Sequence, residues 1–387
     1  MAGGVYLVAA EPSGDALGAD VIAALRAQAP DVALAGVGLD AMARAGVAGP
    51  VDMSDLAILG FFEGLKALDR VKAKAVAVAE DIAARRPDAA VFIDSWGFSL
   101  RAAQALKSLA PDIVRIKLIG PQVWATRPGR ARTLAETFDL LLCMHAFEEP
   151  YYAPWGLETV AIGNPAVGRD APGDGAAFRA RHGLAANDRV LLVLFGSRRA
   201  EIEIVAPVLE AAVRQVRDAR PDLKIITVVP PAVRGLVAAR RPGWGFDALV
   251  IEGESEKPDA FAAADVALAC SGTVTTEVGL QGAAVVVAYK IGWITWAILR
   301  FGGIYRAPFA TLMNVAAGAE IAPEFLQTRC RPDLIAAAVG RRLDEPTVRL
   351  QQVEDQNAAL AKMGRGGPKP ADVAARAILS RIAPGSG

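Results

Sequence analysis

The stretch VLLVLFGSRRAEIE, residues 190–203, decides the fold of this 387-residue chain. Its first six residues, 190–195, are an unbroken run of valine, leucine and phenylalanine, and the GSRR turn that follows gives way to helical spacing. A short apolar run with polar flanks predicts a parallel strand that is buried on both faces. A strand that passes through a turn into a helix is the repeating unit of a doubly wound α/β sheet, which binds ligands where such turns lie.

The turn itself carries residues that suit an anion. Gly196 lets the backbone approach a ligand closely, and Ser197 is placed to cap a helix whose first N–H groups face the ligand. Arg198 or Arg199 adds a planar cation that matches a phosphate group. This stretch alone leaves two interpretations open: an anion-binding loop, or an ordinary strand-to-helix turn with two solvated arginines.

The same strand–turn–helix pattern recurs along the chain and predicts two Rossmann-like α/β domains that face a cleft. Strands are expected at residues 5–9, 32–38, 89–93, 113–119, 140–144 and 160–163, and again at 190–195, 225–229, 249–251, 266–269 and 285–289. The expected division is an N-terminal domain at 1–167, a linker at 168–187, a second domain at 188–350 and C-terminal helices at 351–387.

The composition argues against several classes of function. Lys+Arg and Asp+Glu both number 42, so the formal net charge is +0 and no overall attraction to nucleic acid is expected. Cys143, Cys270 and Cys330 lie far apart in apolar surroundings, which is typical of buried thiols rather than of a disulfide framework or a zinc site. Two histidines are too few for a histidine-rich metal centre, and no DxD motif marks a metal site.

The N-terminus and the apolar stretches bear on location. The opening MAGGVYLVAAEPSGD lacks the basic start and long apolar core of a signal peptide. No window reaches roughly 18–20 uncharged apolar residues, so no membrane-spanning helix is expected. Residues 56–65 and 293–301 are candidates for contact with a membrane surface, with core packing or, for the second stretch, a dimer contact as alternatives. We expect a cytosolic protein that touches a membrane from that side.

A second ligand-binding pattern is ACSGTVTTE at residues 269–277. Ser271, Gly272 and Thr273 follow an expected strand and present hydroxyl and N–H groups at a helix start. Glu277, one helical turn further on, is placed to accept hydrogen bonds from both hydroxyls of a ribose. An ordinary capped helix is the alternative, but the pairing with GSRR in the same domain favours a pocket for a nucleoside diphosphate.

Together these stretches resemble the lipid-A-disaccharide synthase family of GT-B glycosyltransferases, and the resemblance runs nearly end to end. AEPSGD at 10–15 is similar to the family's AGExSGD, and FGSRRAE at 195–201 is similar to its LPGSRxxE. The other stretches that carry the resemblance are residues 53–65, 92–95, 121–125 and 271–277, and Asn314 within LMNVAAG.

Several positions depart from the family pattern. The family's PDFN reads WGFS at residues 96–99, which removes an acid and an amide. Phe195, Met313 and Asn164 replace a proline, a second proline and a histidine, and Thr126 replaces a tryptophan. The nucleotide side is therefore better kept than the acceptor side. A diverged synthase, a paralogue with another acceptor and a member with weakened activity all fit these changes.

The resemblance implies a reaction and a set of site residues. A UDP-linked 2,3-diacylglucosamine would be joined to 2,3-diacylglucosamine 1-phosphate in a β-1′,6 linkage, with inversion and release of UDP, and without a metal ion or cofactor. Asp94, at the end of an expected strand, is the first choice for the base. Asp15 is the second choice, with helix capping as its alternative role, and Arg198 would stabilise the leaving group. Gly196, Ser197, Arg198, Ser271, Gly272, Thr273, Glu277 and Asn314 would bind the donor, and Glu11, Ser13, Gly14, Gln122 and Trp124 would lie on the acceptor side.

Since both implied substrates carry acyl chains, the resemblance also implies peripheral binding to the cytoplasmic face of the inner membrane. It further implies a homodimer in which residues 351–387 exchange between partners, while packing back within one chain is the alternative. Two other functions stay open. One is a different GT-B enzyme, such as an N-acetylglucosaminyl transferase or a UDP-sugar epimerase, and the other is a non-catalytic homologue that binds nucleotide sugar or lipid.

Overall fold

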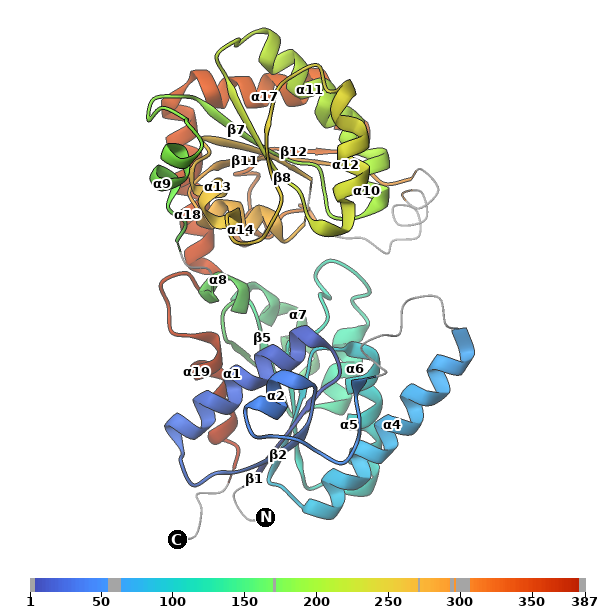
Figure 1. The fold of residues 1–387 in the computed structure, drawn as a ribbon. Helices are drawn as coiled ribbons and strands as arrows, with labels where there is room; N and C mark the ends of the chain where they lie inside the picture. The colour runs from blue at the N-terminus through green and yellow to red at the C-terminus, as the bar shows by residue number, and fades with distance from the viewer. Residues whose placement is uncertain are drawn as a thin grey trace. The chain divides into compact units, whose positions relative to one another are not determined.

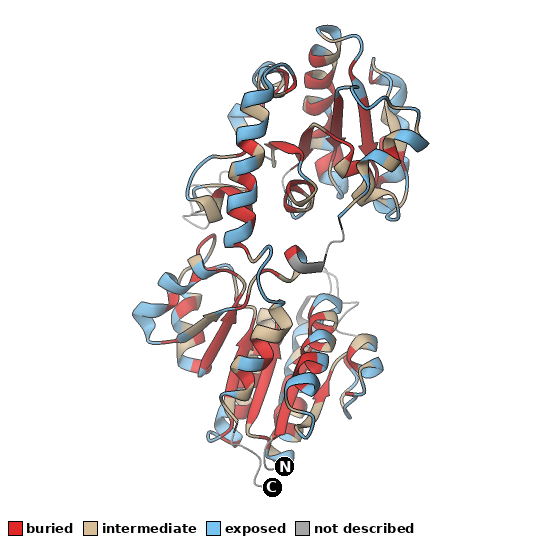
Figure 2. Ribbon diagram, turned by 90° about the vertical axis from the view of Figure 1, so that its left-hand side faces the viewer, coloured by how far each residue is buried: buried red, intermediate tan, exposed pale blue. Residues whose placement is uncertain are grey.

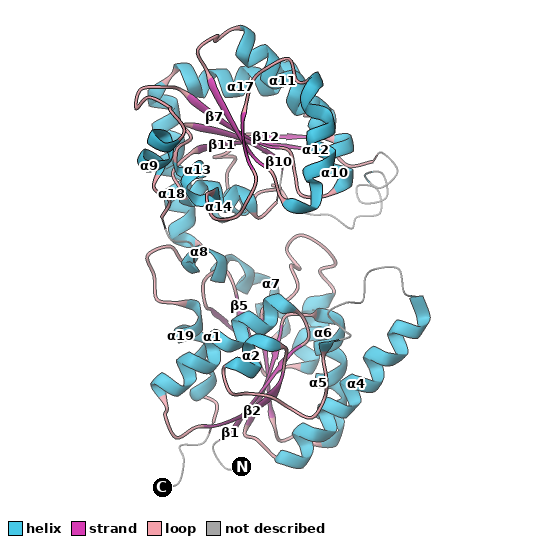
Figure 3. Ribbon diagram, viewed as in Figure 1, coloured by secondary structure: helices cyan, strands magenta, loops and turns pink. Residues whose placement is uncertain are grey.

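The chain forms two compact units, residues 1–168 with 366–387 and residues 169–365 (Figure 1). The computed structural model describes residues 4–54, 64–169, 172–270, 272–292, 296 and 307–382. Each unit contains a six-stranded sheet with helices on its faces (Figure 3). This confirms the predicted α/β class with two Rossmann-like parallel-sheet domains.

The two apolar stretches expected to contact a membrane, 56–65 and 293–301, lie almost entirely outside the described residues. In the part of the chain that is described, no helix combines the length and the apolar character needed to cross a bilayer.

The sheet of the first unit has the strand order β2-β1-β3-β4-β5-β6, and every pairing is parallel. Its strands are β1 (Gly4–Ala9), β2 (Ala33–Val37), β3 (Ala89–Ile93), β4 (Val114–Leu118), β5 (Leu140–Cys143) and β6 (Glu158–Ala161). The chain leaves β1 for β2 on one side and continues on the other side with β3. The crevice between the ends of β1 and β3 is therefore a topological switch point, where open α/β sheets bind ligands.

Helices cover both faces of this sheet. They are α1 (Pro12–Gln28), α2 (Asp40–Arg44), α4 (Gly64–Arg85), α5 (Trp96–Leu109), α6 (Arg130–Thr137), α7 (Glu149–Tyr152), α8 (Pro165–Arg169) and α19 (Pro370–Leu379). One apolar core joins the sheet to α4, α5 and α6, and a second core joins its other face to α1 and α19. The central strands β1, β3, β4 and β5 are buried between these cores, as the red strands of Figure 2 show, whereas the edge strands β2 and β6 are partly exposed.

The last helix, α19, belongs to the first unit although it ends the described chain. It packs against α1, and Gln28 Nε2 donates a hydrogen bond to the carbonyl of Asp372 at 3.0 Å. Ala374, Ala375 and Ile378 are fully buried there. The C-terminal segment that we expected at 351–387 is thus divided between the two units. Helix α18 (Pro346–Lys362) lies in the second unit, where it packs against α14 (Val274–Leu280) and α16 (Leu312–Ala317).

The second unit has the strand order β12-β11-β10-β7-β8-β9, again with parallel pairings. Its strands are β7 (Val190–Leu194), β8 (Lys224–Val228), β9 (Leu249–Ile251), β10 (Val266–Cys270), β11 (Ala284–Tyr289) and β12 (Glu324–Leu326). Its other helices are α9 (Gly175–Arg181), α10 (Arg199–Ile204), α11 (Ala206–Asp218), α12 (Arg234–Arg240), α13 (Lys257–Ala262) and α17 (Pro332–Asp344). The direction of winding reverses between β7 and β10, so their carboxyl ends flank the switch point of this unit.

The expected linker at 168–187 is not an unstructured connection. Helix α9 forms within it and packs against α13, as part of the second unit. Asp174 caps α9, since its carboxylate accepts a hydrogen bond from the backbone N–H of Ala177 at 2.8 Å. A composition of small and charged residues resembled a linker, but these long-range contacts order the segment.

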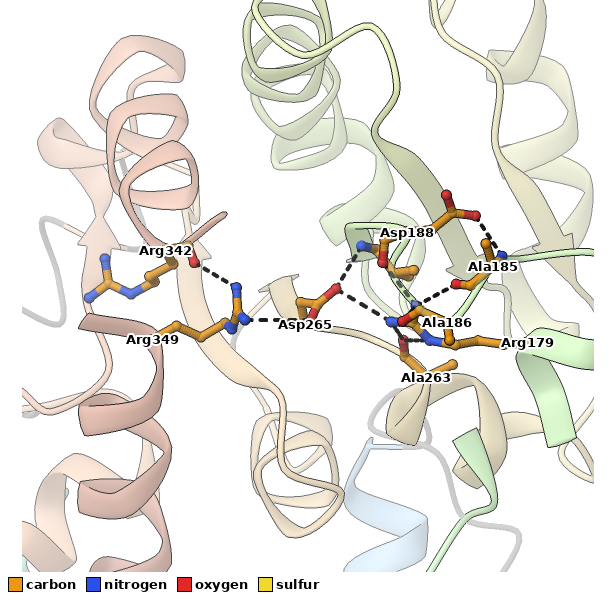
Figure 4. A network of polar contacts seen from close by, with 9 residues as sticks. Arg179, Ala185, Ala186, Asp188, Ala263, Asp265, Arg342 and Arg349 are labelled. Carbon is orange, nitrogen blue, oxygen red and sulfur yellow. Dashed lines mark hydrogen bonds and ion pairs between the residues drawn. The ribbon is translucent and has the colours of Figure 1, made fainter. Parts of the chain in front are cut away.

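Arg179 fastens α9 to the amino end of the second sheet (Figure 4). Its guanidinium donates to the carbonyl of Ala263 at 2.7 Å and to that of Asp188 at 2.8 Å, and it lies 3.4 Å from the carboxylate of Asp265. Asp265 also accepts a hydrogen bond from the backbone N–H of Val190 at 2.9 Å. One half-buried arginine thus connects the helix with the starts of β7 and β10.

Replacing Arg179 should destabilise the second unit. Arg179→Ala leaves several carbonyls without a donor and Asp265 without its nearest cation, and we expect a loss of about 2–3 kcal/mol in the free energy of unfolding. Urea denaturation followed by circular dichroism measures it. Arg341→Ala is the matched control, because Arg341 is 62% exposed and pairs with Glu345, the residue that directly follows its helix. Equal stability of the two variants would contradict this role for Arg179.

Candidate functional site

A pocket of about 460 Å³ lies at the carboxyl ends of β7, β8 and β10 in the second unit. Both predicted ligand-binding stretches contribute to its wall, namely through Gly196, Ser197, Arg198, Gly272, Thr273 and Glu277. Residues of the two stretches thus lie together at the sheet edge that the strand order makes the switch point. Ser271 lies outside the described residues.

The turn after β7 is held by Glu201. The Glu201 carboxylate accepts hydrogen bonds from the backbone N–H groups of Ser197 at 2.8 Å and of Arg198 at 3.2 Å. Ser197 makes no capping hydrogen bond to α10, contrary to our expectation, and these two N–H groups are occupied rather than free. Gly196 has a φ of +114°, and a Cβ there would lie 2.6 Å from the Cβ of Glu201. Only glycine fits this turn without displacing the carboxylate.

The structure distinguishes the two arginines of the turn. Arg198 lines the pocket with a side chain that is 78% exposed and lies 3.4 Å from Glu201 Oε1. Arg199 pairs with Glu203 at 3.3 Å on the surface of α10 and does not line the pocket. Arg198 is therefore the arginine that is available to an anion in the pocket.

Lys257 is a pocket residue that the sequence analysis missed. Its Nζ lies 2.7 Å from Glu277 Oε2 and 3.4 Å from Glu254 Oε2. Burial alone would lower the pKa of Lys257, but the hydrogen bond and charge of Glu277, with the charge of Glu254, raise it overall. The lysine is therefore protonated at neutral pH. Glu277, which we expected to bind ribose hydroxyls, holds this lysine at the pocket wall.

Asn314 does not line the pocket and is fully buried. Its amide nitrogen donates to the carbonyl of Ala322 and to Glu324 Oε1, both at 2.8 Å, and its amide oxygen accepts from the N–H of Ala322 at 2.8 Å. The side chain fixes the start of β12 to α16. Its predicted role in donor binding is therefore wrong, because its hydrogen-bonding groups face the interior.

In the first unit, Asp94 lies at the end of β3, as the sequence predicted. Asp94 and Ser95 adopt left-handed conformations, with φ of +46° and +40°. Two successive non-glycine residues in this region are costly, and such strain gathers at functional sites. The backbone N–H of Asp94 donates to the carbonyl of Leu118 at 2.9 Å, and its carbonyl accepts from Ser99 Oγ at 2.7 Å. These contacts fix the turn that carries the half-buried Asp94 side chain.

Asp15 faces away from solvent and is 3% exposed. Its carboxylate accepts hydrogen bonds from the backbone N–H groups of Leu39 and Ala41, both at 2.7 Å, and of Met42 at 3.2 Å. A carboxylate with three backbone donors stabilises the start of α2. This geometry supports the helix-capping alternative and contradicts the choice of Asp15 as a base.

The predicted acceptor-side residues lie at two strand ends. Glu11 and Ser13 are exposed after β1, and a Cβ at Gly14 would lie 3.7 Å from the Cβ of Asp94, so this turn adjoins Asp94. Gln122 is exposed after β4, whereas Trp124 is buried against Phe147 with ring centroids 5.6 Å apart. The Trp124 indole N–H has no hydrogen-bond partner among the described residues.

Arg127 and Arg130, which the sequence analysis did not select, follow Trp124. The Arg130 guanidinium lies over the ring of Trp96 at 5.1 Å. Burial, together with the positive charge of Arg127, lowers the pKa of Arg130. In the described ranges no carboxylate pairs with either arginine. A like-charged pair of this kind attracts an anion.

Comparison with known proteins gives the family. The family model described as lipid-A-disaccharide synthetase matches residues 5–377. A lipid-A-disaccharide synthase of Paramagnetospirillum magneticum is 38% identical over 98% of this chain and 98% of its own length. In the described ranges, no three His, Cys, Asp or Glu side chains gather as metal ligands would.

Solved structures support the fold. A putative UDP-N-acetylglucosamine 2-epimerase from Listeria monocytogenes has a TM-score of 0.61 at 16% identity, covering 98% of this chain and 95% of its own. MnaA of S. aureus, in a co-structure with UDP, has a TM-score of 0.57 at 14% identity, covering 96% and 94%. At this identity the likeness concerns the GT-B fold alone.

The Gly196 turn gives a prediction about stability. Gly196→Ala places a methyl group against Glu201 at a positive φ, and we expect about 1–3 kcal/mol of destabilisation. Thermal unfolding measures it. Gly243→Ala, in the same unit, is the matched control, since among the described residues no heavy atom beyond its chain neighbours lies within 4 Å of the added Cβ. A melting temperature of Gly196→Ala equal to that of the control would show that the turn adapts freely.

Proposed function

Because the chain belongs to the lipid-A-disaccharide synthase family, we propose that it joins UDP-2,3-diacylglucosamine to 2,3-diacylglucosamine 1-phosphate and releases UDP. The observation that carries this proposal is the pocket in which Arg198 and Lys257 offer two cations at the carboxyl edge of a parallel sheet. Two cations at one pocket wall suit the diphosphate of a UDP-sugar. A solved neighbour of the same fold, MnaA of S. aureus, is a co-structure with UDP.

The proposed reaction is a single displacement. The Asp94 carboxylate takes the proton from the acceptor hydroxyl, whose oxygen forms the new bond to the anomeric carbon of the donor. The bond from that carbon to the diphosphate breaks, and UDP leaves with the electron pair. Arg198 and Lys257 stabilise the negative charge that develops on the diphosphate, so no metal ion or other cofactor is required. Attack from the face opposite the leaving group gives the inverted, β-configured product.

The acceptor carries a phosphate, and the Arg127–Arg130 pair supports its binding. A phosphate monoester supplies the negative charge that would pair with these two cations, and the Trp96 ring holds Arg130 in place. Since both substrates carry acyl chains, we also propose peripheral binding to the cytoplasmic face of the inner membrane. A homodimer is also part of the proposal, with α19 packed back on its own chain, which is the alternative that the contacts of α19 with α1 support.

The central test is UDP release by the purified protein with both substrates in detergent. We expect Asp94→Asn to lower kcat about 10²–10⁴-fold while leaving UDP affinity within twofold, because only the base is lost. Arg198→Ala should lower kcat and weaken UDP binding about tenfold. Arg199→Ala, in the same turn but outside the pocket, is the matched control and should behave as wild type.

The outcomes of this test separate the candidate functions. Wild-type UDP release that depends on the acceptor supports the synthase. Release with a different acceptor would indicate a paralogue, whereas UDP binding without any release would indicate a non-catalytic homologue.

The phosphate contact is tested by the acceptor's KM. Arg130→Met should raise the KM for the 1-phosphate acceptor about tenfold and leave the KM for an acceptor without the phosphate unchanged, because one charge-assisted contact is lost. Arg132→Met is the control, since Arg132 is 65% exposed and pairs with Glu136. Equal effects of Arg130→Met on both acceptors would contradict a phosphate contact.

A further inference from the structure

The first sheet contains a fully buried lysine. Lys117 lies on β4 and is 1% exposed. Its neighbours in register are Phe92 on β3 and Leu141 on β5, which are both apolar and fully buried. A buried ammonium group is costly unless it is paired, so its position requires a compensating interaction.

The amine of Lys117 reaches the end of β3. Nζ donates to the carbonyl of Phe92 at 3.3 Å and makes a short hydrogen bond to the carbonyl of Asp94. The Asp94 carbonyl also accepts the Ser99 hydroxyl. Two side-chain donors therefore converge on one carbonyl at the start of the left-handed Asp94–Ser95 turn, and hydrogen bonds of this kind offset the backbone strain there.

Two carboxylates act on this amine. The charged groups that face Lys117 among the described residues are Asp94, after β3, and Glu11, after β1, while β5 contributes only the apolar Leu141. Burial lowers the pKa of Lys117 from 10.5 to about 7, against the opposing effect of both carboxylates. The lysine is thus poised to change its charge near neutral pH, next to the proposed base.

We propose that Lys117 is a positioning residue. Its amine holds the turn that presents the Asp94 carboxylate, and its positive charge stabilises the carboxylates of both Asp94 and Glu11. The inference rests on the proposed function, in which Asp94 is the base. A purely structural lysine would contribute to the folding of the unit without affecting the pH dependence of the reaction.

The test compares two variants with a matched control on the same strand. Lys117→Met removes both the donor and the charge, and Lys117→Gln keeps a neutral donor. The control is Arg115→Met, because Arg115 is also buried on β4 but donates to the carbonyls of Thr137 at 3.0 Å and Ile113 at 2.9 Å at the opposite end of the strand.

We expect Lys117→Met to lower kcat at least tenfold more than Arg115→Met, with UDP affinity and both KM values within threefold of wild type. Lys117→Gln should recover part of kcat because it restores a donor. The ratio of the wild-type kcat to the Lys117→Gln kcat should be largest at pH 6 and should fall above about pH 7, where the wild-type lysine becomes neutral. The proposal would be overturned if Lys117→Met and Arg115→Met lowered kcat equally and the ratio of the wild-type kcat to the Lys117→Gln kcat did not change with pH.

Thermal unfolding gives a readout that does not depend on activity. Between about pH 7 and 10.5 the unfolded chain binds more protons at Lys117 than the folded chain does. The contribution of Lys117 to the free energy of unfolding therefore rises with pH across that window. The melting temperature of wild type should therefore gain on that of Lys117→Met between pH 7 and pH 9. If wild type releases no UDP, the proposed function fails, and the positioning role of Lys117 toward the base fails with it. If wild type is active but Lys117→Met loses no more kcat than Arg115→Met, the proposed function stands and the positioning role alone is overturned.

Discussion

Burial of parallel strands on both faces is the constraint on which both units depend. Strands such as β7 and β10 are covered by helices on each side, so their side chains are apolar and cannot carry chemistry. Polar groups are consequently displaced to the strand ends, where the chain turns into a helix. In the second unit this displacement brings the Gly196 turn and the Gly272 turn together, because β7 and β10 are neighbours in the sheet.

The exceptions to this constraint are informative. Arg115 and Lys117 both interrupt the apolar pattern of β4, and each satisfies its buried donors on backbone carbonyls. Arg115 anchors the amino end of the strand to Asp139, whereas Lys117 turns toward the carboxyl end, where Asp94 lies. The same device thus serves opposite ends of one strand. Ser99, where the family has the asparagine of PDFN, donates to the Asp94 carbonyl as well.

The sequence predicted eleven of the twelve described strands and six of the fifteen residues that line the pocket, because apolar runs and glycine turns are local signals. It missed β12, which is three residues long and carries the buried Glu324, and it misread α9, whose order depends on contacts of Arg179 far along the chain. It could not foresee that Lys257 enters the pocket. Nor could it tell that Asp15 and Asn314 turn inward, because the direction of a polar side chain depends on which backbone groups the fold brings near it.

The position of α19 has a consequence for the order of synthesis. The first unit is discontinuous, since residues 366–387 return to it after the whole second unit has been made. A chain that emerges from the ribosome begins the first unit before the second but supplies its final helix last. Until then the apolar side of α1 that receives Ala375 and Ile378 lacks its cover. The nascent chain therefore carries an incomplete N-terminal unit for as long as the second unit is being made, and that unit closes only once α19 has left the ribosome.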